Sequence, residues 1–279
     1  MARRIRTLSR IDHQALNHVG VKPLMQRPAF QKRRSDLLQL SRELGRAENS
    51  LAILGEGNVS ARTSEDSLIV KASGTSLATL HEQDLVRCDM NVLLPILDTV
   101  NLTDAEMETK LLACRLDRKS KKPSIETLFH AYLLTLPKVE FVAHTHPPTV
   151  SQILCSPMGR AFAEKRLFPD QIVYCGLSSV FVPYTDPGLP LAQAIRRETI
   201  VFMKKYGDLP QTILLENHGL IALGATAPAV LAASLMSEKS AKVLVGATSL
   251  TGPKFLTDES AMRIARRPDE EYRRHLGQS

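Results

Sequence analysis

The order of helical and β-type segments along the chain constrains its fold more strongly than any single motif does. Residues 31–49 place apolar side chains from Leu37 to Ala47 at spacings of three and four, which is typical of an amphipathic helix. Short β-type pieces punctuated by Gly and Ser follow at residues 58–62 and 67–71. The two patterns alternate in this way to the end of the chain, which favours an α/β fold.

The remaining segments of the chain continue this alternation of helices and strands. Thr103 and Ser124 are predicted to cap the helices that follow them. We predict helices at residues 103–115, 124–134, 191–206 and 227–247, and strands at residues 92–100, 139–146, 173–184 and 212–215. Because no repeat period or linker interrupts the pattern, we expect one layered domain at residues 31–250. A basic arm at residues 1–30 precedes it, and a charged helical tail at residues 251–279 follows it.

The composition is that of an ordinary globular protein, with 43% hydrophobic and 23% charged residues. No apolar run approaches the roughly 18 residues that span a membrane, and the start of the chain lacks the apolar centre of a secretory signal. The four cysteines form no CxxC pair, so we expect reduced thiols. These features predict a cytoplasmic protein without a membrane partner.

The net charge of +7 comes from the beginning of the chain. Residues 1–50 contain 11 Lys and Arg residues against 4 Asp and Glu residues, and the remaining residues carry 25 of each sign. No aromatic side chain is interleaved with the basic arm, so we expect no nucleic-acid partner. The opening MARRIRTLSR also has the Arg-rich character of an organelle transit peptide, although the cue covers only ten residues.

Two histidines close the predicted strand at residues 139–146. In a strand, residues i and i+2 project to the same face, so His144 and His146 point the same way. Pro147 and Pro148 end the strand directly after them. Two neutral imidazoles side by side suit a zinc-type cation, although a histidine pair satisfied within the fold has the same pattern.

A third ligand is found at the end of the strand predicted at residues 212–215. His218 follows this strand, and Gly219 permits a tight turn there. Three protein ligands and one open position are typical of a catalytic rather than a structural zinc site. The other five histidines have no comparable setting, and we interpret them as surface or core residues.

A carboxylate lies in the first turn of the helix before the histidine strand. Glu126 stands two residues after Ser124, in the stretch PSIETLFHA. A carboxylate near a metal serves as ligand or as proton shuttle, and one at a helix N-terminus also interacts favourably with the helix dipole. Both interpretations of Glu126 stay open on the sequence alone.

Three loops have the composition of anion sites or of plain turns. They combine small residues, hydroxyls and exposed amides, which bind phosphate through backbone N–H groups. None of them is a P-loop or a GxGxxG motif, so nucleotide binding is not supported. The three loops are Gly55–Ser60, Lys71–Ser76 and Lys122–Glu126.

The motifs are more specific in combination. GN-x-S, SG-T, PS-x-E, HTHP and N-HGL occur in this order, and the series resembles the class II aldolase/adducin family over residues 37–247, roughly three quarters of the chain. The variants HTHPPTV, VPYTDPG and ENHGLIALG are most similar to the aldolase part of bifunctional rhamnulose-1-phosphate aldolase/dehydrogenase proteins.

The resemblance implies a three-layer α/β/α domain of the fuculose-phosphate-aldolase type, assembled as a homotetramer with active sites between subunits. It implies that His144, His146 and His218 bind Zn²⁺ or another divalent transition metal, and that Glu126 acts as the acid/base. The phosphate-binding positions that it implies are Asn58, Ser73, Gly74 and Ser124, with Gly57 adjacent.

The activity that the resemblance implies is that of a lyase. A ketose 1-phosphate would be cleaved by retro-aldol chemistry into dihydroxyacetone phosphate and an aldehyde. Decarboxylation, epimerisation or dehydration of a sugar (acid) phosphate at the same metal is the first alternative. A non-catalytic, adducin-like interaction module is the second, and it predicts the loss of metal ligands that this chain retains.

One position departs from the family pattern. The family often has two serines before the glutamate, whereas this chain has Ser124 and Ile125. Lys71, beside the SG loop, is a candidate for the missing positive contact to phosphate. The proton-donating tyrosine of the family has no motif, and Tyr174 and Tyr184 are its candidates here.

Overall fold

A mixed sheet organises the part of the chain that the computed structural model describes, residues 28–268. Its seven strands lie in the order β3-β2-β1-β4-β7-β6-β5. All neighbouring strands are antiparallel except β5 and β6, which are parallel. In chain order the strands are β1 (Asn58–Ser64), β2 (Ser67–Lys71), β3 (Leu85–Asp89), β4 (Phe141–Thr145), β5 (Val180–Val182), β6 (Thr212–Leu215) and β7 (Gly219–Gly224).

Helices connect the strands and cover the sheet. Three short 3₁₀ helices are η3 (Ala47–Asn49), η4 (Glu82–Asp84) and η5 (Leu94–Asp98). The α-helices are α1 (Pro28–Leu44), α2 (Met90–Leu93), α3 (Asp104–Ala113), α4 (Thr127–Leu133), α5 (Pro148–Leu154), α6 (Gly159–Glu164), α7 (Pro169–Cys175), α8 (Leu189–Tyr206), α9 (Ala227–Thr248) and α10 (Asp258–Ala265).

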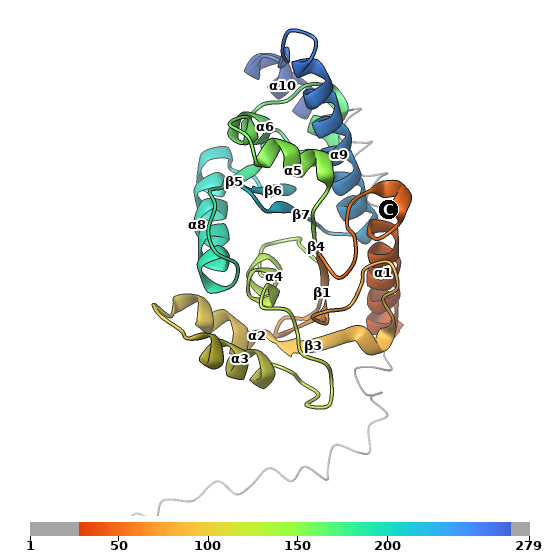
Figure 1. Cartoon of the computed structure of the whole chain (residues 1–279), viewed down its shortest axis with the longest axis vertical. Coiled ribbons are helices and arrows are strands. Elements are labelled where there is room, and N and C mark those ends of the chain that lie inside the picture. Colours follow the sequence, from red (N-terminus) through yellow and green to blue (C-terminus); the bar gives the residue numbers. More distant parts are fainter. Residues whose placement is uncertain (1–27, 269–279) are drawn as a thin grey trace, which may run out of the picture.

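The layers follow from the alternation of side chains along β4. Val142 belongs to a core that β4 shares with α4 and α8, whereas Phe141 and Ala143 belong to a core with α1 and α9. Figure 1 shows α4 and α8 on one side of the sheet and α1 and α9 on the other. The predicted three-layer α/β/α domain is therefore confirmed.

The register of β4 decides what meets at its carboxyl end. On one side His144 pairs with Asn58 of β1, and on the other side it pairs with Ile221 of β7. Because both neighbours run antiparallel to β4, their first residues lie beside its last ones. The carboxyl end of β4 thus meets the amino ends of β1 and β7.

Most of the predicted elements are confirmed within a few residues of their ends. One predicted strand is wrong and another is right only in part. In the segment 92–100, residues 92–98 are helical, because Asp89 caps α2 through the N–H of Asn91 and Pro95 then opens η5. An apolar run of this length has no period that separates a buried strand from a buried helix. In the strand predicted at residues 173–184, α7 extends to Cys175 and only β5 is extended.

The structure describes the two ends of the chain only in part. Residues 1–27 of the predicted basic arm and residues 269–279 of the predicted tail are outside the described residues, and α10 is the part of that tail that is seen as a helix. Within residues 28–268, no helix combines the length and the apolar character that a membrane crossing requires.

A buried carboxylate anchors the helix that follows the histidine strand. Glu238 on α9 is 3% exposed and accepts hydrogen bonds from the hydroxyl of Thr149, at 2.6 Å, and from the N–H of Val150, at 3.2 Å. Both donors belong to the first turn of α5, where N–H groups have no partner within the helix. Glu238 thereby joins α9 to the segment directly after His146.

Replacing Glu238 with Gln is expected to lower the free energy of unfolding by about 1–3 kcal/mol, because a buried donor of α5 loses its charged acceptor. Urea denaturation followed by circular dichroism measures this. The matched control is Lys242→Ala, which removes the exposed partner of Glu238 at 3.5 Å and should cost no more than about 1 kcal/mol. Equal effects of the two changes would contradict this role of Glu238.

Candidate metal centre

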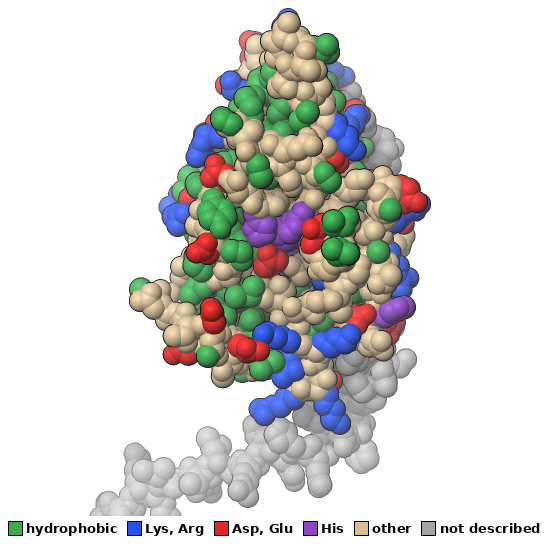
Figure 2. Space-filling model, viewed as in Figure 1, with side chains coloured by type: hydrophobic (Ala, Val, Ile, Leu, Met, Phe, Trp, Pro, Cys, Tyr) green, Lys and Arg blue, Asp and Glu red, His purple; other side chains and the backbone are tan. Residues whose placement is uncertain are grey.

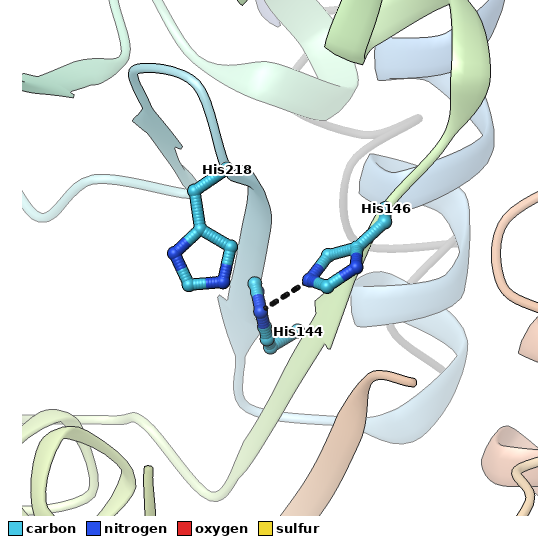
Figure 3. Close-up of side chains that lie close together, drawn as sticks. All are labelled: His144, His146 and His218. Carbon is cyan, nitrogen blue, oxygen red and sulfur yellow. Dashed lines mark hydrogen bonds between the residues drawn. The ribbon is translucent and has the colours of Figure 1, made fainter. Parts of the chain in front are cut away.

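Three imidazole rings converge at the carboxyl end of β4. Ring nitrogens of His144, His146 and His218 all lie within 4.8 Å of one another. Figure 3 shows the three rings turned toward a common point, with His144 and His146 coming from the end of β4 and His218 from the start of β7. The Nε2 atoms of His144 and His146 are 2.9 Å apart. These three side chains could hold a metal ion.

His144 is the most rigidly held of the three rings. It is fully buried, and its Nδ1 lies 3.0 Å from the carbonyl oxygen of Leu220 in the neighbouring strand β7. A carbonyl only accepts, so Nδ1 carries the proton and Nε2 carries a lone pair. Burial lowers the pKa of His144 to about 3, which keeps the ring neutral.

His146 lies just past the end of β4 and is oriented by a different group. Its backbone N–H donates to the carbonyl of Leu51 at 3.0 Å, and its Nδ1 lies 3.3 Å from Oε2 of Glu56. Burial lowers the pKa of His146, and the charge of Glu56 opposes that effect. The carboxylate accepts a hydrogen bond from Nδ1–H, so Nε2 of this ring also carries a lone pair.

The β6–β7 turn delivers the third ring. Asn217 adopts a left-handed φ of 54°, which turns the chain so that His218 stands directly before β7. At Gly219 a Cβ atom would lie 2.6 Å from the carbonyl oxygen of Thr145 and 2.6 Å from Cδ2 of His146. Gly219 is therefore required by the close approach of β4, whereas the sequence suggested a tight turn at this residue.

Glu126 faces the rings from α4. Its Oε1 lies 3.5 Å from Nε2 of His144 and 3.5 Å from Nε2 of His218. Asn58, paired with His144 in the sheet, donates its side-chain N–H to the other carboxylate oxygen. Burial raises the pKa of Glu126, but the neighbouring His144 and His218 outweigh it and hold the pKa at about 2. The carboxylate is thus ionised at neutral pH.

The predicted anion loops gather beside this site. Ala72 forms a β-bridge with Pro123, and the N–H of Ser73 donates to the carbonyl of Lys122 at 2.9 Å. The loop with Ser73 and Gly74 therefore lies next to the turn with Ser124. Ser124 does not cap α4 as predicted; its hydroxyl accepts from the N–H of Glu126, and the helix begins at Thr127.

A buried lysine ties two of these loops together. Lys71 is 1% exposed, and its Nζ donates to the carbonyl of Gly55 at 3.3 Å and to that of Thr75 at 2.5 Å. Burial lowers the pKa of Lys71, and the carboxylates of Glu126 and Asp84 oppose this effect. A single cation thus lies beneath two of the predicted anion loops.

Gly57 joins the first loop to the histidine strand. It has a φ of 74°, and a Cβ atom there would lie 2.8 Å from the carbonyl oxygen of His144. Of the residues predicted for phosphate, Gly57 and Asn58 thus lie at the histidines and Glu126. Ser73, Gly74 and Ser124 lie in the neighbouring loops.

The surroundings of the rings are partly apolar and partly acidic. Figure 2 shows histidine side chains near the middle of one face, with acidic and hydrophobic side chains beside them. The loop with Tyr184 is held to the His218 turn, because the N–H of Tyr184 donates to Glu216 Oε2 at 3.0 Å. Ile125 packs against Gly188 of the same loop. Tyr174 lies in α7, and the role of either tyrosine stays a prediction.

Two contributions were missed in the sequence. Glu56 and its contact to His146 have no local signal, since 90 residues separate the two. The two carbonyl contacts of Lys71 likewise depend on loops that only the fold brings together. Among the other histidines, His130 is in the core as predicted, fully buried, with Ser60 2.7 Å from its Nδ1.

Comparison with known proteins shows a family for most of the chain. Residues 35–245 match the family model described as the Class II Aldolase and Adducin N-terminal domain. A curated relative from Bacillus subtilis (strain 168), described as the uncharacterized oxidoreductase YuxG, is 33% identical over 180 residues, covering 62% of this chain and 24% of that protein. The chain therefore spans about a quarter of that relative's length.

Solved structures share the fold. An L-fuculose 1-phosphate aldolase superposes with a TM-score of 0.63 at 19% identity, covering 87% of this chain and 96% of that chain. YgbL from Klebsiella pneumoniae, described as a candidate aldolase, epimerase or decarboxylase, gives a TM-score of 0.62 at 20% identity, covering 84% of this chain and 98% of that chain.

The close approach at Gly219 can be tested by adding one methyl group. Gly219→Ala is expected to lower the free energy of unfolding by about 1–3 kcal/mol, because backbone of β4 cannot move away without disturbing the sheet. Urea denaturation measures the change. Gly246→Ala in α9 is the control; nothing lies within 4 Å of its added methyl, so the helix should gain up to about 1 kcal/mol. An unchanged Gly219→Ala protein would contradict the packing argument.

Proposed function

The chain belongs to the class II aldolase and adducin family, and we propose that it is a metal-dependent lyase that cleaves a ketose 1-phosphate into dihydroxyacetone phosphate and an aldehyde. The observation that supports this most is the arrangement of His144, His146 and His218 opposite the ionised carboxylate of Glu126. Three imidazole nitrogen donors and one facing carboxylate are the components of a catalytic rather than a structural metal site.

The polar contacts of the rings fit a divalent ion. The Nε2 lone pairs of His144 and His146 face each other at 2.9 Å, which is repulsive unless a positive charge lies between them. A proton joins two nitrogens, whereas a metal ion accepts all three that converge here.

Such an ion, when bound, supplies Lewis-acid polarisation of the sugar carbonyl. Its identity within the proposal is Zn²⁺ or another divalent transition metal, since imidazole serves several of them. The three histidines would hold it, with the ring of His144 fixed by Leu220 and that of His146 by Glu56.

The carboxylate of Glu126 is placed to move the proton. In a retro-aldol cleavage the carbinol hydroxyl loses its proton, the adjacent carbon–carbon bond breaks, and its electron pair moves toward the carbonyl. The departing half becomes an aldehyde, and the retained half takes up a proton at carbon. Glu126 is ionised, faces the rings and is oriented by Asn58, so it can carry that proton.

The phosphate of the substrate is assigned to the loops beside Glu126. Lys71 lies beneath the loops of Gly55 and Thr75, where its charge favours an anion. The hydroxyls of Ser73 and Ser124 and the backbone at Gly57 and Gly74 offer donors, together with Asn58. Lys71 would compensate for the hydroxyl that Ile125 lacks.

Relatives support both the proposal and its first alternative. One structural neighbour is an L-fuculose 1-phosphate aldolase, whereas YgbL has epimerase and decarboxylase among its candidate activities. A decarboxylase, epimerase or dehydratase of a sugar (acid) phosphate would use the same ligands. The likeness to the aldolase part of bifunctional aldolase/dehydrogenase proteins is part of the proposal and rests on the motifs HTHPPTV, VPYTDPG and ENHGLIALG.

A non-catalytic, adducin-like module is the alternative of another class. It gives no reason for three converging imidazoles, two of them oriented by hydrogen bonds, or for the ionised Glu126 among them. We also propose a homotetramer in the cytoplasm, with a sugar phosphate as its small-molecule partner and neither nucleic acid nor membrane as partners. The division into an arm at residues 1–30, a domain at residues 31–250 and a tail at residues 251–279 is part of the proposal.

A panel of ketose 1-phosphates and sugar acid phosphates, with and without added Zn²⁺, Co²⁺ or Mn²⁺, tests the function. We expect dihydroxyacetone phosphate and an aldehyde from at least one ketose 1-phosphate, and only when metal is present. His146→Ala should lose both bound metal and turnover. Release of CO₂ would select the decarboxylase, and wild-type turnover in a metal-free His146→Ala protein would overturn the scheme.

Replacing Glu126 with Gln separates proton transfer from metal binding. The amide cannot take up a proton, so turnover should fall by about 10²–10⁴-fold while the metal content stays close to one ion per chain. Steady-state kinetics and metal analysis of the same sample measure the two effects. Glu65→Gln, in the exposed turn between β1 and β2, is the control and should match the wild type. Unchanged turnover in Glu126→Gln would remove Glu126 from the mechanism.

A further inference from the structure

The Nδ1 atoms of His144 and His146 are held by different kinds of hydrogen-bond acceptor. His144 is buried and donates to a backbone carbonyl inside the sheet, so its orientation is part of the fold. His146 lies beyond the last residue of β4, and its side chain is 27% exposed. The carboxylate of Glu56 is the one hydrogen-bond partner found for its Nδ1 among residues 28–268.

Glu56 is itself held in place by its own turn. Its Oε1 accepts from the N–H of Ile53 at 2.7 Å, and its own N–H donates to the carbonyl of Ile53 at 3.2 Å. The first contact fixes one carboxylate oxygen, and the second closes the turn. The other carboxylate oxygen is left for His146. The carboxylate is thus positioned before any ligand binds.

The turn with Glu56 is attached to the histidine strand on both sides. Before it, the carbonyl of Leu51 accepts from the N–H of His146. After it, Gly57 packs against the backbone of His144 and Asn58 pairs with the same residue. None of these contacts uses the side chain of Glu56, so a substitution that keeps the turn alters only the side-chain contact to His146.

We propose that Glu56 is a positioning residue for the metal: by accepting a hydrogen bond from the Nδ1–H of His146, it fixes the tautomer in which Nε2 offers its lone pair to the ion. It does not belong to the ligand cluster, which comprises the three histidines. Carboxylates behind a ligating histidine orient the ring and increase its basicity, and their loss typically weakens metal binding by about 10–100-fold. The inference rests on the proposed metal centre but not on the identity of the reaction.

Glutamine at this position is a sharp test. Its single amide oxygen can still accept from the N–H of Ile53, so the turn is kept. The NH₂ group then faces His146 and donates to Nδ1, which favours the opposite tautomer and places a proton on Nε2. A merely structural role of Glu56 would leave metal binding unchanged in this variant.

The experiment uses the full chain, stripped of metal with a chelator and titrated with Zn²⁺ against a chromophoric chelator. We expect the Zn²⁺ dissociation constant of Glu56→Gln to rise about 10–100-fold, with the urea midpoint of the metal-free protein unchanged. The visible absorption spectrum of the Co²⁺ form should change as well. Glu65→Gln is the matched control and should bind like the wild type. Glu56→Ala, which also loses the contact to Ile53, should bind at least as weakly.

The outcomes separate this inference from the proposed function. Wild-type affinity in both Glu56 variants would overturn the inference and leave the lyase proposal standing. Weakened binding in a protein that cleaves no sugar phosphate would support the inference and remove the lyase proposal. A wild-type chain that binds no Zn²⁺ would overturn both.

Discussion

The antiparallel pairing of β4 with β1 and β7 is the constraint on which the site depends. Each pairing is fixed by hydrogen bonds along the strands and by a buried face on either side of the sheet. A slip of one residue would turn His144 from the α4 side to the α1 side and move the histidines apart. The same register sets Asn58 beside His144 and Gly219 beside His146. The pairing of β4 therefore places His144, His146 and Asn58, and the β6–β7 turn adds His218.

Placing these groups together is costly unless their charges are balanced. The ionised carboxylate of Glu126 is largely buried among the three rings, and within residues 28–268 buried Lys71 has the carbonyls of Gly55 and Thr75 as its hydrogen-bond partners. Burial of unpaired charge is unfavourable, so each of these groups gains from a ligand of opposite sign. A divalent ion at the rings and an anion near Lys71 are the two ligands that would balance these buried charges. Binding of both would also stabilise the fold by mass action.

The sequence predicted the parts of the site that obey a local rule. His144 and His146 share a face because residues i and i+2 of a strand do, and His218 could be found because it also ends a strand. Glu56 could not be predicted, since its role depends on a turn that reaches His146 only after β1 has paired with β4. The strand predicted at residues 92–100 failed for a different reason: Asp89 and Pro95 select helical turns in a run whose apolar pattern fits either element. The sequence predicted the site residues that follow the period of a strand, and it missed the contacts between segments that lie far apart in the sequence.

The two carboxylates beside the rings, Glu56 and Glu126, have different surroundings, and the roles proposed for them differ for that reason. Glu56 has both oxygens engaged in hydrogen bonds, by Ile53 and by His146, so its carboxylate is oriented toward a ring. Glu126 has one oxygen engaged by Asn58, and its other oxygen lies 3.5 Å from Nε2 of both His144 and His218. Under the proposed function only Glu126 can therefore exchange a proton with a bound sugar. Ile125, the residue before Glu126, lies against Gly188 of the Tyr184 loop, and neither adds a ligand to the cluster, so under the same proposal they would decide which sugar reaches Glu126.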